Sequence, residues 1–258
     1  MEIFPSDQIS RLWRRGAKAF QRFCPSLCDL CRQPSHHLPL LCKCCHQDLA
    51  GFDYQQLAGN LLNHPAIVGH LPKMAFQQLV CACPYVWPLD IWLMQLKYQR
   101  RVELVPVLAH LLVATLKLIR ESNQHQQQNP YHVADLLVPV PLSPLRLRQR
   151  QFNQALLLAD IISREIGGFV DTSLIGRRQS LQRQVGKSGV QRRMALKNSF
   201  YITPSAADTI KGKHVAIVDD VLTTGTTANM IAKLLLKHGV ATVSVYTVAL
   251  SLPVMRRD

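Results

Sequence analysis

The sequence predicts an α/β fold: a parallel β-sheet flanked by helices, preceded by a small cysteine-rich segment. Two short apolar runs, at residues 136–140 and 215–218, have the composition of strands buried on both faces of a parallel sheet. Each run leads into a turn and then into a stretch with helical apolar periodicity, as the strand–helix units of an α/β domain do. Six of the eight cysteines lie between Cys24 and Cys45, which sets that segment apart from the rest of the chain.

Length and composition are sufficient for one sizeable domain and a small one, because the chain has 258 residues and is 48% hydrophobic. No apolar run reaches the roughly 18 residues needed to cross a bilayer. The start, Met-Glu-Ile-Phe-Pro, lacks the basic and then apolar segments of a signal peptide. We therefore expect a cytoplasmic protein without a membrane span. The formal net charge of +14 favours a polyanionic partner, although a phosphate ligand could use part of that charge.

Changes in composition divide the chain into four regions. They are a basic amphipathic helix at 1–23, a metal-binding segment at 24–50, a helical connecting region at 51–130 and an α/β domain at 131–258. In the first region, Leu12, Trp13, Ala17 and Phe20 alternate with arginines and lysines. This helix could contact a membrane surface or nucleic acid. Packing of its apolar face on the rest of the protein is the favoured interpretation.

The cysteines of the second region have the spacing of a metal site. Cys28 and Cys31 are separated by two residues, and Cys42 and Cys45 form a second pair ten residues later. Two such pairs can place four thiolates around one zinc ion. This set leaves no open coordination position, so the site would be structural. Alternative ligands are Cys24, Cys44, His36, His37 and His46, and the remaining alternative is a cluster of free buried thiols.

The third region is expected to be mainly helical. Apolar periodicity predicts helices near 53–63, 71–80, 89–98 and 104–119. The polar, low-complexity stretch at 121–130 is expected to be an exposed loop. Cys81 and Cys83 have too few partners nearby for a metal site, and we expect them to pack in the core.

The strand at 136–140 runs into a turn that is rich in proline and arginine, followed by a helix from about 153 to 166. Arg146, Arg148 and Arg150 in this turn could hold a pyrophosphate by bidentate contacts. A solvated basic turn is the alternative interpretation.

The strand at 215–218 is followed by two carboxylates and a hydroxyl-rich turn, and these residues organise the rest of the domain. Asp219 and Asp220 stand where we expect the strand to end, and the helix begins directly after the turn at 223–227. The first N–H groups of that helix would attract an anion, and Gly225 would let the backbone approach a phosphate closely. The two acids would suit ribose hydroxyls or a hydrated magnesium ion. An ordinary helix cap with two solvated acids explains neither the paired acids nor four threonines around a glycine.

This stretch resembles the phosphoribosyl-pyrophosphate (PRPP) motif of type I phosphoribosyltransferases. The wider chain resembles the ComF family of competence proteins and their GntX-like relatives, in which a cysteine-rich zinc segment precedes a phosphoribosyltransferase-like domain. The strand that runs into Pro139, Pro141 and the arginines, and then Phe152-Asn153-Gln154, carries this second resemblance. The sequence has Gln151 where the family usually has glycine. The resemblance covers nearly the whole chain, from Cys28 to about Leu250.

The resemblance implies a fold, a ligand and a set of roles. The fold is a type I phosphoribosyltransferase-like sheet, and the ligand is PRPP with magnesium. The ribose hydroxyls would be held by Asp219 and Asp220, which would also be the catalytic residues. The PRPP-binding residues would be Asp219, Asp220, Val221, Thr223, Thr224, Gly225, Thr226 and Thr227. The turn that contains Arg146, Arg148 and Arg150 would face the pyrophosphate.

Residues 172–207 contain seven cations and no acid. The cations are Arg177, Arg178, Arg183, Lys187, Arg192, Arg193 and Lys197. This stretch resembles the hood that phosphoribosyltransferases fold over PRPP, and it also has the charge of a phosphate-backbone footprint. A merely solvated basic loop is the alternative.

The family resemblance implies a role in moving or using single-stranded DNA, together with other DNA-uptake or recombination proteins. The alternative is an active phosphoribosyltransferase of nucleotide salvage with an unidentified acceptor, and whether PRPP is turned over is left open. The sequence identifies neither that acceptor nor the oligomeric state.

Overall fold

The structure, a computed structural model, describes residues 26–35, 38, 40–71, 73–126, 133–178, 199–204 and 209–251. The chain divides into two compact units, Met1–Leu49 and Ala50–Asp258, and each is considered by itself. The expected helix at 1–23 and Cys24 lie outside the described residues.

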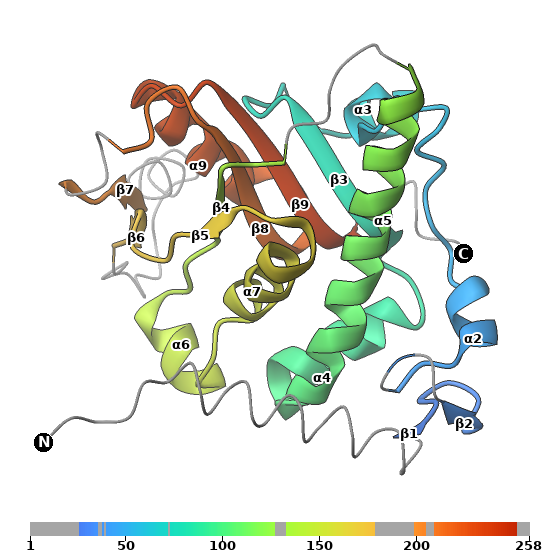
Figure 1. The fold of residues 1–258 in the computed structure, drawn as a ribbon. Helices are drawn as coiled ribbons and strands as arrows, with labels where there is room; N and C mark the ends of the chain where they lie inside the picture. Colours follow the sequence, from blue (N-terminus) through green and yellow to red (C-terminus); the bar gives the residue numbers. More distant parts are fainter. Residues whose placement is uncertain are drawn as a thin grey trace, which may run out of the picture. The chain divides into compact units, whose positions relative to one another are not determined.

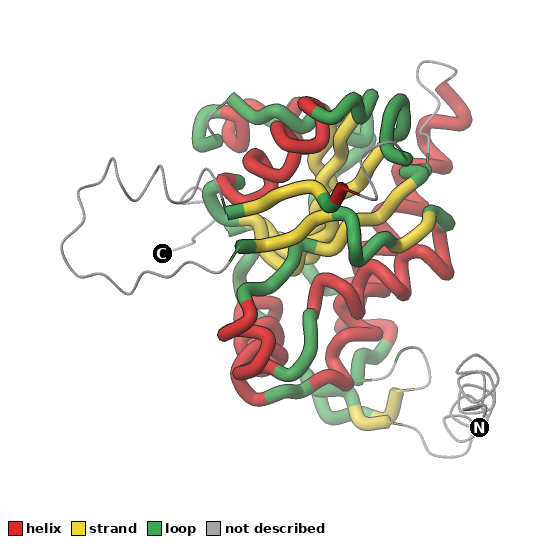
Figure 2. Tube along the Cα trace, turned by 90° about the vertical axis from the view of Figure 1, so that its left-hand side faces the viewer, coloured by secondary structure: helices red, strands yellow, loops and turns green. Residues whose placement is uncertain are grey.

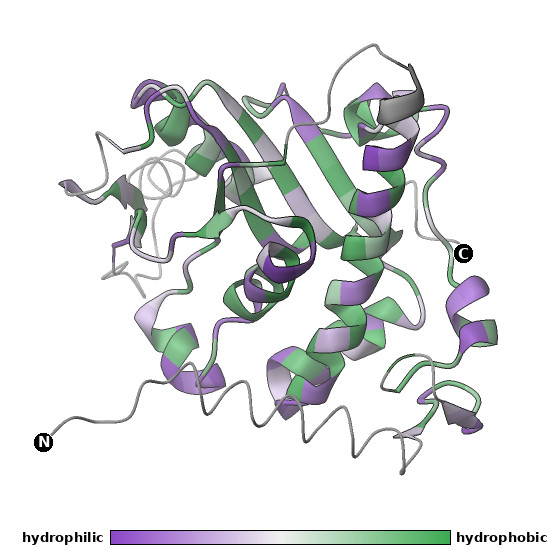
Figure 3. Cartoon of the chain, in the orientation of Figure 1, coloured by the Kyte–Doolittle hydropathy of each residue, from purple (hydrophilic) through white to green (hydrophobic). Residues whose placement is uncertain are grey.

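The larger unit is built on one five-stranded sheet in which every pair of neighbouring strands is parallel (Figure 1). In spatial order the strands are β3 (Gln78–Pro84), β9 (Thr242–Leu250), β8 (His214–Leu222), β4 (Leu136–Pro139) and β5 (Phe169–Val170). The core runs along the central strand β8, where the side chains of 215–218 are fully buried. Figure 3 shows hydrophobic residues along the strands of the sheet. The predicted α/β class with a parallel sheet is confirmed.

Helices cover both faces of this sheet. The helices of the larger unit are α3 (Pro65–Val68), α4 (Leu89–Gln99), α5 (Val105–Gln126), α6 (Pro144–Arg150), α7 (Gln154–Ile166) and α9 (Thr226–Lys237), with 3-10 turns η1 (Leu61–Asn63) and η2 (Val102–Leu104). On one face, α5 packs against β3, β9 and α7, and α7 packs against β8 and β4. On the other face, α9 packs against β8 and β9 (Figures 1 and 2).

The neighbouring strands β4 and β8 are followed by helices on opposite faces of the sheet. After β4 the chain enters α7 and pairs next with β5, whereas after β8 it enters α9 and pairs next with β9. The two connections therefore diverge at the carboxyl ends of β4 and β8. In open α/β sheets a ligand binds in the crevice that such a divergence leaves.

The residues at the two ends of helix α7 determine where the helix begins and ends. The side chain of Asn153 caps the helix by accepting a hydrogen bond from the Ala155 N–H at 3.0 Å. The helix ends at Gly167, and Gly168 follows with φ +87°. A Cβ atom at Gly168 would lie 2.6 Å from the Ala134 carbonyl oxygen. Only glycine therefore fits the turn that leads from α7 into β5.

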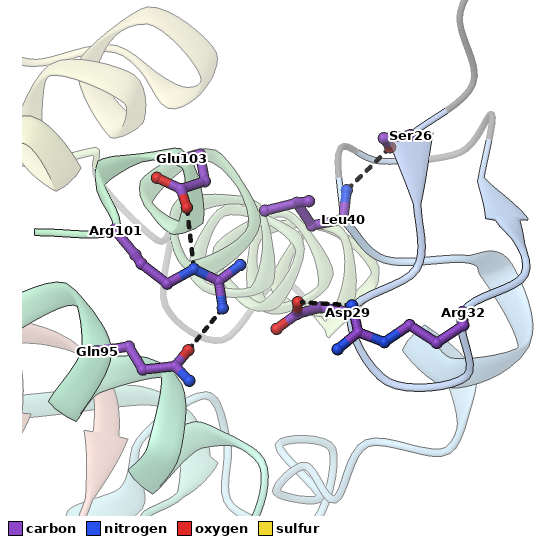
Figure 4. Close-up of polar contacts among 7 residues, drawn as sticks. All are labelled: Ser26, Asp29, Arg32, Leu40, Gln95, Arg101 and Glu103. Carbon is purple, nitrogen blue, oxygen red and sulfur yellow. Dashed lines mark hydrogen bonds and ion pairs between the residues drawn. The ribbon is translucent and has the colours of Figure 1, made fainter. Parts of the chain in front are cut away.

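The smaller unit contains a two-stranded sheet of β1 (Ser26–Leu27) and β2 (Pro34–Ser35), and a short helix α2 (Lys43–Gln47). Its turns are held by local contacts. The Ser26 hydroxyl oxygen accepts a hydrogen bond from the Leu40 N–H at 3.1 Å, and Arg32 approaches Asp29 at 3.8 Å (Figure 4). A small antiparallel pair, β6 (Ile175–Arg177) and β7 (Phe200–Ile202), belongs to the larger unit.

Three expectations about secondary structure are wrong. The helix expected at 71–80 is absent, and its end forms the edge strand β3, because an apolar run of this length also fits a buried strand. Residues 53–63 contain only the turn η1. Residues 121–126 of the expected loop are helical, because α5 continues to Gln126 despite its polar end, and 127–130 lie outside the described residues.

Helix α5 is the one helix among the described residues that is long and apolar enough, by composition, to cross a membrane. Its apolar window, Val102–Ser122, is 56% buried. Because α5 packs against the sheet and α7, this apolar character is that of a core helix.

The outer edge of β3 is closed by side chains instead of a further strand. The Tyr54 hydroxyl donates a hydrogen bond to the Cys81 carbonyl at 2.8 Å and accepts one from the Cys81 N–H at 2.7 Å. Asn60 accepts a hydrogen bond from the Leu79 N–H at 3.0 Å. An open strand edge is otherwise a template for aggregation, so these contacts protect it. Cys81 and Cys83 are buried in this strand, as the packing interpretation expects.

Replacing Tyr54 with Phe should destabilise the larger unit. The change would leave the buried N–H and carbonyl of Cys81 without their partner, at a cost on the order of 1–3 kcal/mol for each group. Urea unfolding of the two proteins measures this difference. Tyr98→Phe is the matched control, because the Tyr98 side chain is exposed. Equal unfolding midpoints for Tyr54→Phe and the wild type would contradict this account of the β3 edge.

Candidate functional site

The loop between β8 and α9 forms a small pocket of about 60 Å³. Its lining comes from the end of β8, from the loop and from the first turn of α9, with Val245 of β9: Asp219, Val221, Leu222, Thr223, Thr224, Gly225, Thr226, Thr227, Ala228 and Val245. The residues predicted for PRPP binding therefore lie together around one cavity, with the exception of Asp220.

Gly225 has the backbone conformation that this loop requires. It is the N-cap residue of α9, with φ +68°, and no side chain caps the helix at this position. A Cβ atom here would lie 2.5 Å from Cε of Met74. The Thr224 and Thr226 hydroxyl oxygens lie 2.9 Å apart beside it. Helix N–H groups and hydroxyls thus face the same cavity, which is the arrangement that binds a phosphate.

Asp219 and Asp220 lie inside β8 and not after it, because the strand continues to Leu222. Their pairing with the neighbouring strand β4 has already ended, since its last partner in β8 is Val218. Successive residues of a strand point to opposite faces of the sheet. Asp219 consequently lines the pocket on the α9 face, whereas Asp220 is buried on the face that α7 covers.

The Asp219 carboxylate has a strongly altered environment. Its Oδ1 accepts a hydrogen bond from the Asp220 N–H at 2.9 Å. Burial raises the pKa of Asp219 well above its ordinary value, and the neighbouring Asp220 raises it further, while Lys97 opposes the shift. A perturbed carboxyl group in a pocket is a feature of functional sites.

The buried partners of Asp220 were not assigned to the site from the sequence, although one of them, Gln154, belongs to the motif Phe152-Asn153-Gln154. Lys97 of α4 forms an ion pair with Oδ2 of Asp220 at 2.6 Å. Gln154, the first residue of α7, donates a weak hydrogen bond to Oδ1 at 3.5 Å. The signal for Lys97 was its position, four residues after the buried Leu93 on the inward face of its helix.

The arginines expected at the pyrophosphate do not lie in a turn. They are on helix α6, where Arg146 and Arg150 are four residues apart and share a face, and Arg148 points elsewhere. Arg150 lies over the ring of Tyr98, 5.8 Å from its centroid. Helix α6 forms because Ser143 caps it, accepting a hydrogen bond from the Arg146 N–H, and Pro144 starts it.

Gln151, at the position where relatives carry glycine, has a left-handed conformation with φ +67° and ends α6. This backbone conformation is one that glycine adopts without strain. The side-chain oxygen of Gln151 accepts a hydrogen bond from Nη1 of Arg100 at 3.2 Å.

Arg177 of β6 belongs to the same neighbourhood as Asp219. Its Nη1 donates a hydrogen bond to the Pro141 carbonyl at 3.2 Å, and its guanidinium lies 5.2 Å from the centre of the Phe200 ring. Burial lowers the pKa of Arg177, Arg146 lowers it further, and Asp219 raises it.

Two of the seven cations predicted for nucleic acid, Arg177 and Arg178, are described. Arg178 is exposed and lies over Tyr201, 5.8 Å from the ring centroid. The others, Arg183, Lys187, Arg192, Arg193 and Lys197, lie outside the described residues.

In the smaller unit, the sulfur atoms of Cys28, Cys31, Cys42 and Cys45 all lie within 4.8 Å of one another. The Cys31 and Cys42 sulfurs are 3.7 Å apart. A zinc ion with bonds of about 2.3 Å to four thiolates requires neighbouring sulfurs about 3.8 Å apart, so this cluster could hold such an ion. Cys44, an alternative ligand, is exposed and lies outside the cluster.

The backbone favours a thiolate at Cys28. Burial raises the pKa of this thiol, but N–H groups of Cys31, Cys42 and Leu30 lower it to about 6. In contrast, burial and the neighbouring thiols raise the pKa of Cys45. Four mutually close thiols repel as thiolates, and a bound cation removes that repulsion.

Comparisons with known proteins agree with this geometry. Residues 153–252 match the family described as "Phosphoribosyl transferase domain". A purine phosphoribosyltransferase from Pyrococcus horikoshii Ot3 resembles the structure with a TM-score of 0.31 at 18% identity, covering 57% of this chain and 72% of that one. The match of residues 153–252 to this family defines a protein with a phosphoribosyltransferase-like domain.

Similar proteins of known name define a narrower family within this class. The DNA utilization protein YhgH of Escherichia coli O157:H7 is 34% identical over 233 residues, which cover 86% of this chain and 96% of that protein. Competence protein F of Haemophilus influenzae is 32% identical over 216 residues, covering 81% and 90%. Competence protein ComFC of Bacillus subtilis is 34% identical over 113 residues, or 43% of each chain. The chain belongs to this ComF family of competence and DNA utilization proteins.

The cysteine cluster should hold one zinc ion per chain. Replacing Cys28 or Cys42 with Ser should abolish binding, because each change removes one of four thiolates, and should make the smaller unit sensitive to protease. Metal analysis of the purified protein and limited proteolysis measure the two effects.

Cys44→Ser is the matched control and should keep its zinc, because Cys44 lies outside the cluster. Purified wild-type protein without stoichiometric metal, together with a protease-resistant Cys28→Ser variant, would show that the cluster is not a zinc site.

Proposed function

We propose that this protein binds PRPP, accompanied by magnesium, between the carboxyl ends of β4 and β8, and that it acts in the uptake or use of single-stranded DNA in the cytoplasm. The observation that carries the proposal is the pocket at the start of α9, where Asp219 and the threonine-rich loop meet. Membership of the ComF family supports the DNA role, since relatives are named for competence and DNA utilization.

Each part of PRPP has a complementary part of this site. The 5′-phosphate fits the loop at 223–227, whose hydroxyls and helix N–H groups line the pocket. The ribose hydroxyls would be held by Asp219, which faces the pocket, while Asp220 would support Asp219 from behind through its N–H group. The pyrophosphate would lie toward Arg146 and Arg177, because Arg146 is near enough to lower the pKa of Arg177.

These cations also make transfer chemistry feasible, and this supports the second candidate function. A phosphoribosyl transfer breaks the bond between the ribose and the pyrophosphate, and positive charge beside the leaving group stabilises that step. An active transferase of nucleotide salvage, with an unidentified acceptor, therefore uses the same site.

The role in the uptake or use of DNA would depend on the basic stretch at 172–207 and on other proteins. Seven cations without an acid between 172 and 207 exceed what one PRPP molecule requires. Exposed Tyr98 and Tyr201, each beneath an arginine, are suited to stacking on bases. Other DNA-uptake or recombination proteins are the expected partners.

Removing the acidic charges should weaken PRPP binding. We expect the Asp219→Asn/Asp220→Asn variant to lose on the order of 1.5–3 kcal/mol of binding free energy for each contact to the ribose that it loses. Calorimetry with PRPP and magnesium measures the affinity. Asp160→Asn, a change on the middle of α7, is the control and should bind as the wild type does. Unchanged affinity in the double variant would remove Asp219 and Asp220 from the site.

The basic stretch should bind single-stranded DNA without PRPP. The affinity should fall with salt at a log–log slope of about −0.7 for each phosphate contacted. Changing Arg192 and Arg193 to Ala should weaken binding equally for all sequences and flatten the slope by roughly one to two units. Fluorescence anisotropy of a labelled oligonucleotide over a salt series measures both quantities.

Lys233→Ala/Lys237→Ala is the matched control, because it removes two exposed cations from α9. It should leave the slope as it is. If the protein does not bind single-stranded DNA at about 0.1 M salt and on the order of 1 µM protein, the proposed DNA role is wrong. An active transferase is then the better explanation of the site.

A further inference from the structure

The Asp219–Asp220 pair has a buried counter-ion outside the phosphate loop. The Lys97 ammonium lies 2.6 Å from Oδ2 of Asp220, and the two side chains are only 17% and 6% exposed. A lysine is rarely buried to this extent without a specific partner. Such a pair is costly to desolvate, so its presence next to a ligand pocket calls for a role.

Helix α4 holds Lys97 firmly in this position. Leu89, Trp92, Leu93 and Leu96 are buried on the inward face of the helix, and Lys97 extends that face. Arg101 holds the C-terminal end of α4 in place by two hydrogen bonds. Its Nη1 donates a hydrogen bond to Gln95 at 2.7 Å, and its Nε donates one to Glu103 at 2.9 Å (Figure 4). The position of the Lys97 ammonium is therefore set by a helix that is held both along its buried face and at its C-terminal end.

Gln154 approaches the same carboxylate from α7. Its side chain is 3% exposed, and its Nε2 lies 3.5 Å from Oδ1 of Asp220. Asp220 thus meets a cation on one oxygen and an amide donor on the other. These contacts fix the orientation of its carboxylate, and they come from two separate helices.

The charges of the site explain why this counter-ion matters. Asp219 and Asp220 are adjacent, and burial, together with the neighbouring Asp220, raises the pKa of Asp219. Lys97 acts in the opposite direction on Asp219 and pairs directly with Asp220. Lys97 is therefore the cation that offsets the repulsion between the two adjacent acids.

We propose that Lys97 is a positioning residue of the phosphoribosyl site. By pairing with Asp220 it fixes the end of β8, where the Asp220 N–H holds the Asp219 carboxylate toward the ribose hydroxyls. This inference rests on the proposed function, because it assigns a role in binding PRPP. Lys97 itself does not line the pocket.

The test is a double-mutant cycle on PRPP affinity, measured by calorimetry in the presence of magnesium. Lys97→Met should weaken binding by roughly tenfold or more, since it removes a charge-assisted contact. In an Asp220→Asn background, the same change should alter affinity by less than about twofold, because the partner through which Lys97 acts is already neutral. Lys97→Arg, which keeps the charge, should recover part of the lost affinity.

The matched control is Lys117→Met. Lys117 pairs with Glu165 at 2.9 Å, but both side chains are about half exposed, and the pair joins α5 to α7. Its loss should leave PRPP affinity unchanged, since an exposed pair contributes little. Melting temperatures of all variants separate effects on binding from effects on folding.

Each possible result of these measurements supports or overturns the role proposed for Lys97. Unchanged affinity in folded Lys97→Met overturns the proposal, and an equal loss in the Asp220→Asn background overturns it as well, because Lys97 would then contact the ligand directly. If Lys97→Met does not fold, the Asp220→Asn/Lys97→Met variant, which removes both charges of the pair, is compared with Asp220→Asn, and this comparison still applies the second criterion. A wild-type protein that does not bind PRPP overturns the proposed function together with this role, whereas binding that is insensitive to Lys97 overturns this role alone.

Discussion

The alternation of side chains along one buried strand is the constraint on which the rest of this site depends. Asp219 and Asp220 are consecutive residues of β8, so their carboxylates must leave the sheet on opposite faces. One reaches the pocket at the start of α9, and the other enters the layer of helices on the far side. The acid on the far side is buried and therefore needs partners, which Lys97 and Gln154 supply.

This arrangement links segments that are distant in the sequence. Helix α4 contributes the Lys97 ammonium and α7 contributes the Gln154 side-chain amide. The β8–α9 loop contributes the threonine hydroxyls and Gly225. The connections after β4 and β8 diverge at the carboxyl ends of these strands, where open α/β sheets bind their ligands. Arg177 of the β6–β7 pair joins from a further segment, close enough to be influenced by both Asp219 and Arg146. The residues between β3 and β4 are consequently part of the ligand domain and contribute to its site.

Residues that act through local spacing could be predicted from the sequence, and residues that act through tertiary contacts could not. The four clustered cysteines and the loop at 223–227 are each contained in one short stretch, and the structure brings each set together. Lys97 was missed because its partner lies more than a hundred residues away. The helix predicted at 71–80 overlaps the start of strand β3, because a short apolar run fits both structures. The segment of α6 is predicted to be a turn because Pro144 and the arginines resemble an irregular basic loop.

The central claim is that the loop at the start of α9 holds the 5′-phosphate of PRPP. Phosphorus NMR tests it most directly, because the 5′-phosphate and the pyrophosphate give separate resonances. On titration of PRPP and magnesium with the protein, the account predicts that the 5′-phosphate resonance shifts and broadens, and that Gly225→Ala weakens this change because alanine is strained at the φ of +68° that the loop requires. A 5′-phosphate resonance that is unperturbed by excess wild-type protein would contradict the account.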